Sequence, residues 1–282
     1  MVNESAPLIS IIVAVYNGKA TLQQCIDSVA QQTYPNKELI VIDGGSSDGT
    51  VELLGVNSNK LNFWISEPDN GIYNAWNKGL EQARGEWICF LGADDYFWND
   101  TVLERMAAQL IKLPASIRVA YGQIMQIGND GKSSHIIGEP WLKIKEAFKQ
   151  HMCIPHVGTM HRKKLFELRG KFDESFGIAG DYELLLRELI TGDAAFIPDL
   201  IVAGQRLGGL STLGTNYLVT LREVRRAQKI HQQDFSRTLL MKLIFREYLL
   251  LLLWKLLGER SARNLLDLRR RIKGLPPYWT KT

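Results

Sequence analysis

The sequence predicts an α/β fold in which a mainly parallel sheet is flanked by helices, with a helical extension at the C-terminal end. Four apolar runs of strand length recur within residues 8–91 and do not alternate with polar residues, which is typical of strands buried on both faces. Segments with a helical spacing of apolar residues follow these runs. Composition shifts near Leu210, so we expect one unit over residues 1–210 and a second, helical one over residues 211–282.

The N-terminal part of the first unit is expected to contain four strands, each followed by a helix. The run over 8–17 is a strand rich in Ile and Val, and the helix after it reaches about Gln32. The run over 37–43 is a second strand, and the GGSSDGT turn after it supplies a cap for a helix from Val51. NFWIS and EWICFL predict the next two strands, with helices over about 72–84 and 101–112.

The alternation breaks after residue 112. VAYGQIMQIGNDGKSSHII predicts a hairpin that turns at Asn129-Asp130-Gly131. A short strand and two helical pieces are expected next, and AAFIPD predicts a last strand. From Thr215 we expect basic helices to about Lys273.

Charge and cysteine content limit the protein's class. Residues 219–273 carry 14 Lys or Arg against five acidic residues, although the net charge of the whole chain is only +4, so the tail is its basic part. Cys25, Cys89 and Cys153 stand far apart among apolar residues and are interpreted as buried free thiols of a reducing compartment. The N-terminus lacks a signal-peptide pattern and no run is apolar enough to span a membrane, so we expect a cytoplasmic protein.

Polar residues gather at the predicted carboxyl ends of the strands, where open α/β sheets bind their ligands. These residues are Tyr16, Asn17, Asp43, Glu67, Asp69, Asp94 and Asp95. The adjacent carboxylates of Asp94 and Asp95 favour a hard divalent cation, Mg²⁺ or Mn²⁺, that also binds substrate phosphate, although they could instead cap the following helix. Neither a P-loop nor a G-x-G-x-x-G motif is present, which disfavours a dinucleotide-binding or P-loop enzyme and leaves open a nucleotide bound through a metal.

Four motifs resemble the family-2 inverting glycosyltransferases with the GT-A fold. They are ISIIVAVYNG, ELIVIDGGSSDGT, EPDNGIYNAWNKGLEQARGEWICFLGADD and FDESFGIAGDYELLLR, and the resemblance extends over about 7–213. It is greatest to bacterial enzymes of capsule, O-antigen and exopolysaccharide assembly. It implies a Rossmann-like, mainly parallel sheet that binds a nucleotide-sugar, most simply a UDP-sugar.

The resemblance also implies residue roles. Asp43 would hydrogen-bond uracil, while Ala14, Tyr16 and Asn17 would lie against base and ribose. Asp94 and Asp95 end a DxD-type motif that binds ribose and, through Mn²⁺ or Mg²⁺, the diphosphate. The chain departs from this motif at Gly92, where many members have a further Asp.

Asp181 matches the position of the family's catalytic base. The family often has Glu-Asp there, whereas this chain has Gly180 before the Asp. A carboxylate with a raised pKa in a partly desolvated pocket can take the proton of an acceptor hydroxyl as that hydroxyl attacks the anomeric carbon. The alternative is that Asp181 caps a helix that starts at Tyr182.

Weaker candidates have simpler alternatives. Asp69 and Lys78 are expected to line the donor pocket, but Asp69 precedes an ordinary turn and Lys78 could be a solvated helix residue. His156 is expected to reach the acceptor or the diphosphate. Arg206 and the loop over 208–211 could close over the phosphates or only connect two elements.

The basic tail suggests contact with a membrane surface. Residues 239–258 are strongly apolar but are interrupted by charged residues, as in a helix that lies among anionic lipid headgroups. Packing on the first unit or on a partner subunit is the alternative, and a homo-oligomer remains open. No aromatic stacking platform accompanies the charge, which disfavours nucleic acid.

The expected function is therefore inverting transfer of a sugar from a nucleotide-sugar to a saccharide, with a polyprenyl-diphosphate-linked glycan as acceptor. The enzyme would be peripheral on the inner face of the cell membrane. A polyprenyl-phosphate sugar synthase and a non-catalytic nucleotide-sugar-binding scaffold are the alternatives.

Overall fold

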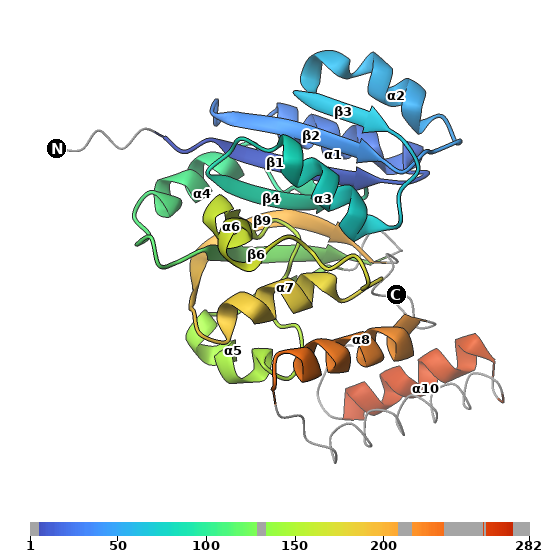
Figure 1. The fold of residues 1–282 in the computed structure, drawn as a ribbon. Helices are drawn as coiled ribbons and strands as arrows, with labels where there is room; N and C mark the ends of the chain where they lie inside the picture. The colour runs from blue at the N-terminus through green and yellow to red at the C-terminus, as the bar shows by residue number, and fades with distance from the viewer. Residues whose placement is uncertain (1–5, 129–133, 208–215, 234–255, 257, 273–282) are drawn as a thin grey trace.

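A single mixed sheet with helices on both faces forms the centre of the molecule (Figure 1). The computed structural model describes residues 6–128, 134–207, 216–233, 256 and 258–272. The strand order is β3-β2-β1-β4-β8-β6-β9-β5, with β7 paired to β6. A mainly parallel sheet flanked by helices is therefore confirmed.

The first part of the sheet consists of four parallel strands. They are β1 (Ile9–Val15), β2 (Lys37–Asp43), β3 (Phe63–Ser66) and β4 (Trp87–Gly92), each within or next to a run predicted from the sequence. Ile12 on β1 lies between Ile40 of β2 and Phe90 of β4. Because all four strands run in one direction, their carboxyl ends meet at one edge of the sheet.

The second part of the sheet starts with a change of direction. The strand β8 (Met160–Arg162) pairs antiparallel with both β4 and β6 (Val119–Ile127). The strand β7 (Ser134–Ile137) pairs antiparallel with β6 as the predicted hairpin, whose turn residues lie outside the described part of the chain. The strand β5 (Tyr96–Phe97) completes this part by pairing antiparallel with β9 (Ala194–Arg206).

The strand β9 is longer than the AAFIPD prediction. Pro198 and Asp199 interrupt its apolar pattern, and Asp199 has a positive φ of 56°. The strand nevertheless continues past them, because the residues that follow regain a parallel register with β6 from Ile201 onward.

The helices agree with the sequence pattern in their places but end earlier than expected. In the first unit these are α1 (Lys19–Ala30), α2 (Thr50–Val56), α3 (Ile72–Gln82) and α4 (Val102–Leu110), with a 3-10 turn, η1 (Ser58–Lys60), between α2 and β3. The later ones are α5 (Trp141–Phe148), α6 (Lys163–Arg169), α7 (Gly180–Leu189), α8 (Tyr217–Ile230) and α10 (Glu259–Ile272).

The core has one layer on each face of the sheet. Alternate residues of β1 divide between them: Ile11 and Val13 pack with α1 and α4, whereas Ile12 packs with α3 and α7. The helix α3 lies very close to β1 at Gly79, where an added Cβ would come within 2.4 Å of Ile12 Cγ2. This close approach fixes the start of α3, and with it Tyr73, above the carboxyl ends of the strands.

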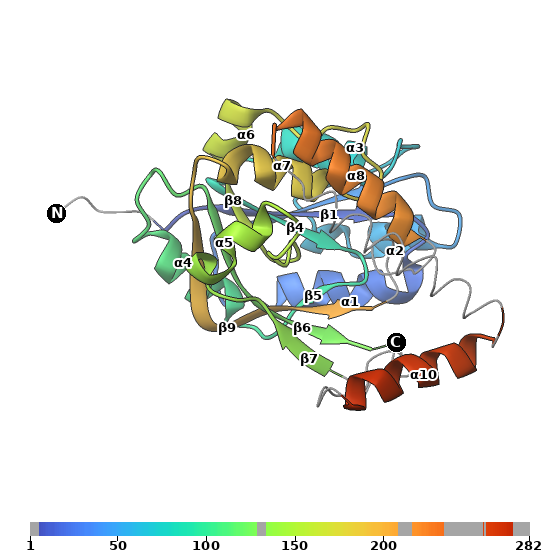
Figure 2. The same ribbon diagram turned by 90° about the horizontal axis from the view of Figure 1, so that it is seen from below.

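The helix α8 belongs to the predicted tail but packs against α7 (Figures 1 and 2). Among the residues that the structure describes, no helix combines the length and the apolar character needed to cross a membrane. The apolar segment over 239–258 lies outside the described residues except for 256 and 258.

The three cysteines are free, as the sequence indicates. Cys25 and Cys89 are buried in the core, but Cys153 is only half-buried. The expectation of burial was wrong for Cys153, which lies in the irregular segment between α5 and β8 and packs only in part against the core.

Candidate active site

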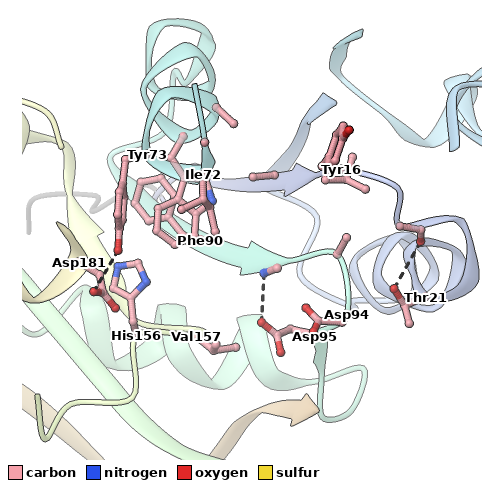
Figure 3. Close-up of a pocket in the computed structure, with 18 of the residues that line it drawn as sticks. Tyr16, Thr21, Ile72, Tyr73, Phe90, Asp94, Asp95, His156, Val157 and Asp181 are labelled. Carbon is pink, nitrogen blue, oxygen red and sulfur yellow. Dashed lines mark hydrogen bonds between the residues drawn. The ribbon is translucent and has the colours of Figure 1, made fainter. Parts of the chain in front are cut away.

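A pocket of about 610 Å³ opens at the carboxyl ends of β1 and β4 (Figure 3). Nine of the eleven predicted site residues line it, and two, Asp43 and Lys78, do not. The lining residues among the predictions are Ala14, Tyr16, Asn17, Asp69, Asp94, Asp95, His156, Asp181 and Arg206.

One wall of the pocket is the loop after β1. The Tyr16 side chain is 68% exposed, and Asn17 has a left-handed φ of 50°. The Asn17 N–H donates to Ser46 Oγ (2.6 Å), and Asn17 Oδ1 accepts from the Ser47 N–H (3.0 Å). These contacts join the loops after β1 and β2 into one rigid rim, which leaves the aromatic ring of Tyr16 free for a ligand.

Asp43 is fully buried beneath this rim. Its Oδ2 accepts hydrogen bonds from the Gly45 and Ser46 N–H groups (3.1 and 2.9 Å) and from Ser66 Oγ (2.6 Å). In this structure Asp43 therefore organises the turn after β2.

Lys78 lies outside the pocket lining as well. Its Nζ forms an ion pair with Glu67 (2.7 Å) and donates to the Pro68 carbonyl (3.1 Å). Both contacts tie α3 to the loop after β3. Asp69, on the same loop, does line the pocket and accepts a hydrogen bond from the Gly71 N–H (2.8 Å).

Asp94 and Asp95 have different environments. Asp95 is 5% exposed and accepts a hydrogen bond from the Gly92 N–H (3.1 Å), and burial raises the pKa of its carboxyl, with a further rise from the charge of Asp94. The carboxylate of Asp94 forms no hydrogen bond or ion pair with any residue that the structure describes. Neither residue caps α4, whose N-cap is Thr101, so the capping alternative was wrong.

Asp181 lies in the first turn of α7, where Ala179 is the N-cap. Its Oδ1 accepts hydrogen bonds from the Tyr182 N–H (2.7 Å) and, at 3.4 Å, from the Tyr73 hydroxyl. Burial raises the pKa of Asp181 to about 6, and these two hydrogen bonds oppose the rise. Asp181 is therefore not the helix cap, and its carboxylate is poised to take a proton near neutral pH.

Aromatic rings form the floor between Asp181 and the Asp94-Asp95 pair. The His156 ring stacks on Phe90 (ring centroids 5.7 Å apart) and lies 5.1 Å from Trp76. Burial lowers the pKa of His156 to about 3, so the imidazole is neutral. Its Nε2 has no hydrogen-bond partner within the described part of the chain. Arg206 lies across the pocket, where it donates to Gln24, and the loop over 208–211 lies outside the described residues.

The family model described as "Glycosyl transferase family 2" matches residues 10–175, more than half of the chain. The chain belongs to this family. The match includes the loops after β1 to β4 and the region of His156, and it ends just before the segment that carries Asp181.

Curated relatives of this family 2 glycosyltransferase include mycobacterial proteins. A PGL/p-HBAD biosynthesis glycosyltransferase of Mycobacterium tuberculosis is 29% identical over 215 residues, which cover 73% of this chain and 80% of the relative. Another glycosyltransferase of Mycobacterium tuberculosis is 34% identical over 185 residues, 65% of this chain and 69% of the relative.

Solved structures confirm the GT-A fold of the glycosyltransferase. Residues 1–349 of TarS from S. aureus, in complex with UDP-GlcNAc, match with a TM-score of 0.63 and 19% identity, over 83% of this chain and 69% of that one. The chain spans only 41% of the longer TarS chain. The mannosyltransferase PcManGT from Pyrobaculum calidifontis, in complex with GDP-Man and Mn²⁺, matches with a TM-score of 0.57 and 17% identity, over 93% and 75%.

The carboxylates of this glycosyltransferase fit a divalent cation. Asp94 presents an unpaired carboxylate to the pocket beside the carboxyl of Asp95, whose pKa is raised by burial and then by the charge of Asp94. Within the described residues no group of three or more His, Cys, Asp or Glu side chains is placed to hold a metal, so water and phosphate oxygens would have to complete its shell. Such partial protein ligation is typical of Mg²⁺ with phosphate ligands.

Gly180 is one of the two positions, with Gly92, at which this glycosyltransferase departs from the expected motifs. A Cβ added at Gly180 would lie 2.8 to 2.9 Å from three ring atoms of Tyr73, so the family's Glu cannot stand here while that ring does. The hydroxyl of Tyr73 instead reaches Asp181 and also donates to the Ile178 carbonyl (2.6 Å). The sequence interpretation missed Tyr73, although the replacement of Glu by Gly180 was a signal that another side chain fills this place.

Proposed function

We propose that this glycosyltransferase moves one sugar from a UDP-sugar to a saccharide acceptor with inversion at the anomeric carbon. The observation that carries the proposal is Asp181, a carboxyl with a pKa of about 6 that shares one pocket with the Asp94 and Asp95 carboxylates. The pocket thus combines a base that is ionised at neutral pH with a separate place for a diphosphate.

The donor's nucleotide would lie on the rim after β1. Tyr16 offers an exposed ring to the base, and Ala14 and Asn17 line the same wall. Asp43, beneath the rim, would hold the turn after β2 through its hydrogen bonds to that turn. If the turn opens, an oxygen of Asp43 could accept a hydrogen bond from uracil. The complex of the TarS neighbour with UDP-GlcNAc supports uridine as the nucleotide.

Asp94 and Asp95 would hold Mn²⁺ or Mg²⁺ together with the diphosphate. When bound, such a cation supplies positive charge that stabilises the departing nucleotide diphosphate. Arg206, whose positive charge also acts on the Asp95 carboxyl, would add a positive charge for the same phosphates. Its guanidinium lies 6.0 Å from the centroid of the Tyr96 ring, which restrains its position.

Asp181 would take the proton of the acceptor hydroxyl. The hydroxyl attacks the anomeric carbon, the bond from that carbon to the diphosphate oxygen breaks, and the proton goes to Asp181 Oδ. His156 is neutral and lines the same pocket, so its imidazole does not compete for this proton.

The acceptor is proposed to be a polyprenyl-diphosphate-linked saccharide at the inner face of the cell membrane. The helix α10 exposes Leu265, Leu268 and Ile272 and also the basic side chain of Arg271, a combination that suits an anionic lipid surface.

Transfer of label from UDP-sugars tests the proposal. Purified protein is incubated with radiolabelled UDP-glucose, UDP-galactose or UDP-GlcNAc, a bacterial lipid extract and Mn²⁺. We expect one donor to put label into the organic phase, with the label lost on addition of EDTA and restored by excess Mn²⁺. A product that runs as a monoglycosyl polyprenyl phosphate would favour the synthase alternative. Binding of UDP without any transfer would favour a non-catalytic scaffold.

A further inference from the structure

The loop that leads into Asp181 is held by α8, a helix from outside the family match. The carboxylate of Glu223 on α8 accepts three backbone hydrogen bonds, each of 2.8 Å, from the N–H groups of Gly177, Ile178 and Ala179. A single carboxylate that receives three consecutive N–H groups fixes the path of the backbone through this loop. Ala179 is the N-cap of α7, so this contact also sets where the helix of Asp181 begins.

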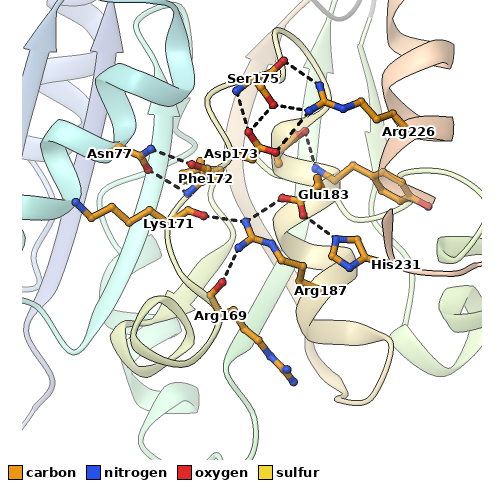
Figure 4. A network of polar contacts seen from close by, with 12 residues as sticks. Asn77, Arg169, Lys171, Phe172, Asp173, Ser175, Glu183, Arg187, Arg226 and His231 are labelled. Carbon is orange, nitrogen blue, oxygen red and sulfur yellow. Dashed lines mark hydrogen bonds and ion pairs between the residues drawn. The ribbon is translucent and has the colours of Figure 1, made fainter. Parts of the chain in front are cut away.

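A second side chain of α8 holds the earlier half of the loop. The guanidinium of Arg226 donates to the carbonyl (3.1 Å) and the hydroxyl of Ser175 and lies 3.8 Å from Asp173 (Figure 4). It also stacks over the Phe176 ring, 4.3 Å from its centroid. Within residues 173–179, α8 therefore contacts Asp173 and each residue from Ser175 to Ala179, whereas Glu174 accepts hydrogen bonds from Asn74 and Asn77 of α3.

The C-terminal end of α8 is anchored separately. His231 Nε2 lies 2.7 Å from Glu183 Oε1 on α7, and Gln228 Nε2 donates to the Gln150 carbonyl (2.8 Å). The helix that holds the loop is thus itself fixed to the body of the enzyme. Its contacts with the loop can therefore hold the loop in a fixed position relative to α7.

We propose that Glu223 is a positioning residue for Asp181 and that α8 thereby completes the active site. This inference rests on the proposed function of Asp181 as the base. Glu223 acts through the backbone, because it accepts the hydrogen bond from the Ile178 N–H. The Ile178 carbonyl in turn accepts a hydrogen bond from the Tyr73 hydroxyl, which also lies 3.4 Å from Asp181 Oδ1. Loss of Glu223 would release the loop and shift Asp181 relative to the acceptor.

The charge of Glu223 also acts on Asp181. Three groups face the Asp181 carboxyl from neighbouring elements: the Tyr73 hydroxyl of α3, the Glu223 carboxylate of α8 and, across the pocket, neutral His156. The hydrogen bond from Tyr73 lowers the pKa of Asp181, and the negative charge of Glu223 raises it. Removal of the Tyr73 hydroxyl and removal of the Glu223 charge should therefore move the acid limb of the pH–activity profile in opposite directions.

The test measures kcat and donor KM from pH 5 to 8 for three variants. We expect Glu223→Gln to lower kcat by about 10- to 100-fold, a size typical of a small misplacement of a catalytic group, and to move the acid limb to lower pH with donor KM unchanged within about 2-fold. Tyr73→Phe should move the acid limb to higher pH. Arg222→Gln, an exposed neighbour on the same helix, should match the wild type.

Glu223→Asp keeps the charge but shortens the side chain, so it tests the inference if Glu223→Gln does not fold. It should lower kcat and leave the acid limb in place. Wild-type kcat and acid limb in a folded Glu223→Gln or Glu223→Asp variant would overturn the inference. Asp181→Asn serves as reference: if it keeps full activity, the proposed function fails, whereas a dead Asp181→Asn beside a fully active Glu223→Gln refutes only the role of Glu223.

Discussion

At Gly92 the absence of a side chain leaves room for the carboxylates of Asp94 and Asp95, the proposed metal ligands. A Cβ added there would lie 2.7 Å from Asp94 Oδ1 and 3.0 Å from Asp95 Oδ2, so both carboxylates would have to move. We expect Gly92→Ala to weaken Mn²⁺-dependent UDP binding about 10-fold, equivalent to about 1.4 kcal/mol. Isothermal titration calorimetry measures this change.

Gly55→Ala is the matched control, because nothing lies within 4 Å of a Cβ added at Gly55. It should leave UDP binding unchanged. Equal affinities of the wild type and Gly92→Ala would mean that the two carboxylates do not bind the donor in the positions described.

Single residues show where sequence reasoning stops. Strand ends can be read from apolar runs, which put Asp94 and Asp95 at the carboxyl edge of the sheet, whereas Asp181 was expected there only from the family resemblance; all three line one pocket. The sequence could not tell that Asp43 turns down to the N–H groups of its own turn, or that Lys78 pairs with Glu67. Those outcomes depend on local side-chain competition, which leaves no periodic pattern in a sequence.

The element α7 is fixed to its neighbours by a buried carboxylate. Glu188 is fully buried; its Oε1 pairs with Arg118, just before β6 (2.6 Å), and its Oε2 with Arg169 of α6 (3.0 Å). Removal of one partner of a buried ion pair typically costs about 3 kcal/mol or more. We therefore expect Glu188→Gln to lower the free energy of unfolding by about 3 kcal/mol in urea denaturation.

Glu167→Gln, which breaks an exposed pair with Lys164 on α6, is the control and should change stability by less than about 0.5 kcal/mol. Similar losses of unfolding free energy in both variants would show that the buried ion pairs of Glu188 stabilise the fold no more than an exposed pair does. The two ion pairs of Glu188 were not visible in the sequence, because α7, α6 and the segment before β6 meet only in the folded chain.

Elements as such were largely predictable, since buried strands and amphipathic helices have strong periods. The length of β9 and the role of α8 were not. Pro198 disguised the continuation of β9. The basic composition of α8 suggested a lipid surface, although its Glu223 carboxylate binds the loop before α7 and its Gln228 amide binds the Gln150 carbonyl after α5.

At the scale of the whole molecule, α10 is the described part that suits a lipid surface. Burial of an exposed leucine side chain is worth about 1.5 to 3 kcal/mol. We expect the protein to sediment with vesicles that contain anionic lipid, and Leu268→Ser to weaken this binding about 10-fold. Leu142→Ser, which changes an exposed leucine of α5, should bind as the wild type does. Equal binding to purely zwitterionic vesicles, or no effect of Leu268→Ser, would contradict a lipid-facing α10.

The central claim is that Asp181 takes the acceptor's proton in a pocket that binds the donor independently of it. The most direct test is kcat of Asp181→Asn at saturating donor, together with its Kd for UDP and Mn²⁺. We expect kcat to fall about 10³-fold, within the range for loss of a general base, while Kd changes by less than about 2-fold. A kcat within about 10-fold of the wild type would contradict the central claim.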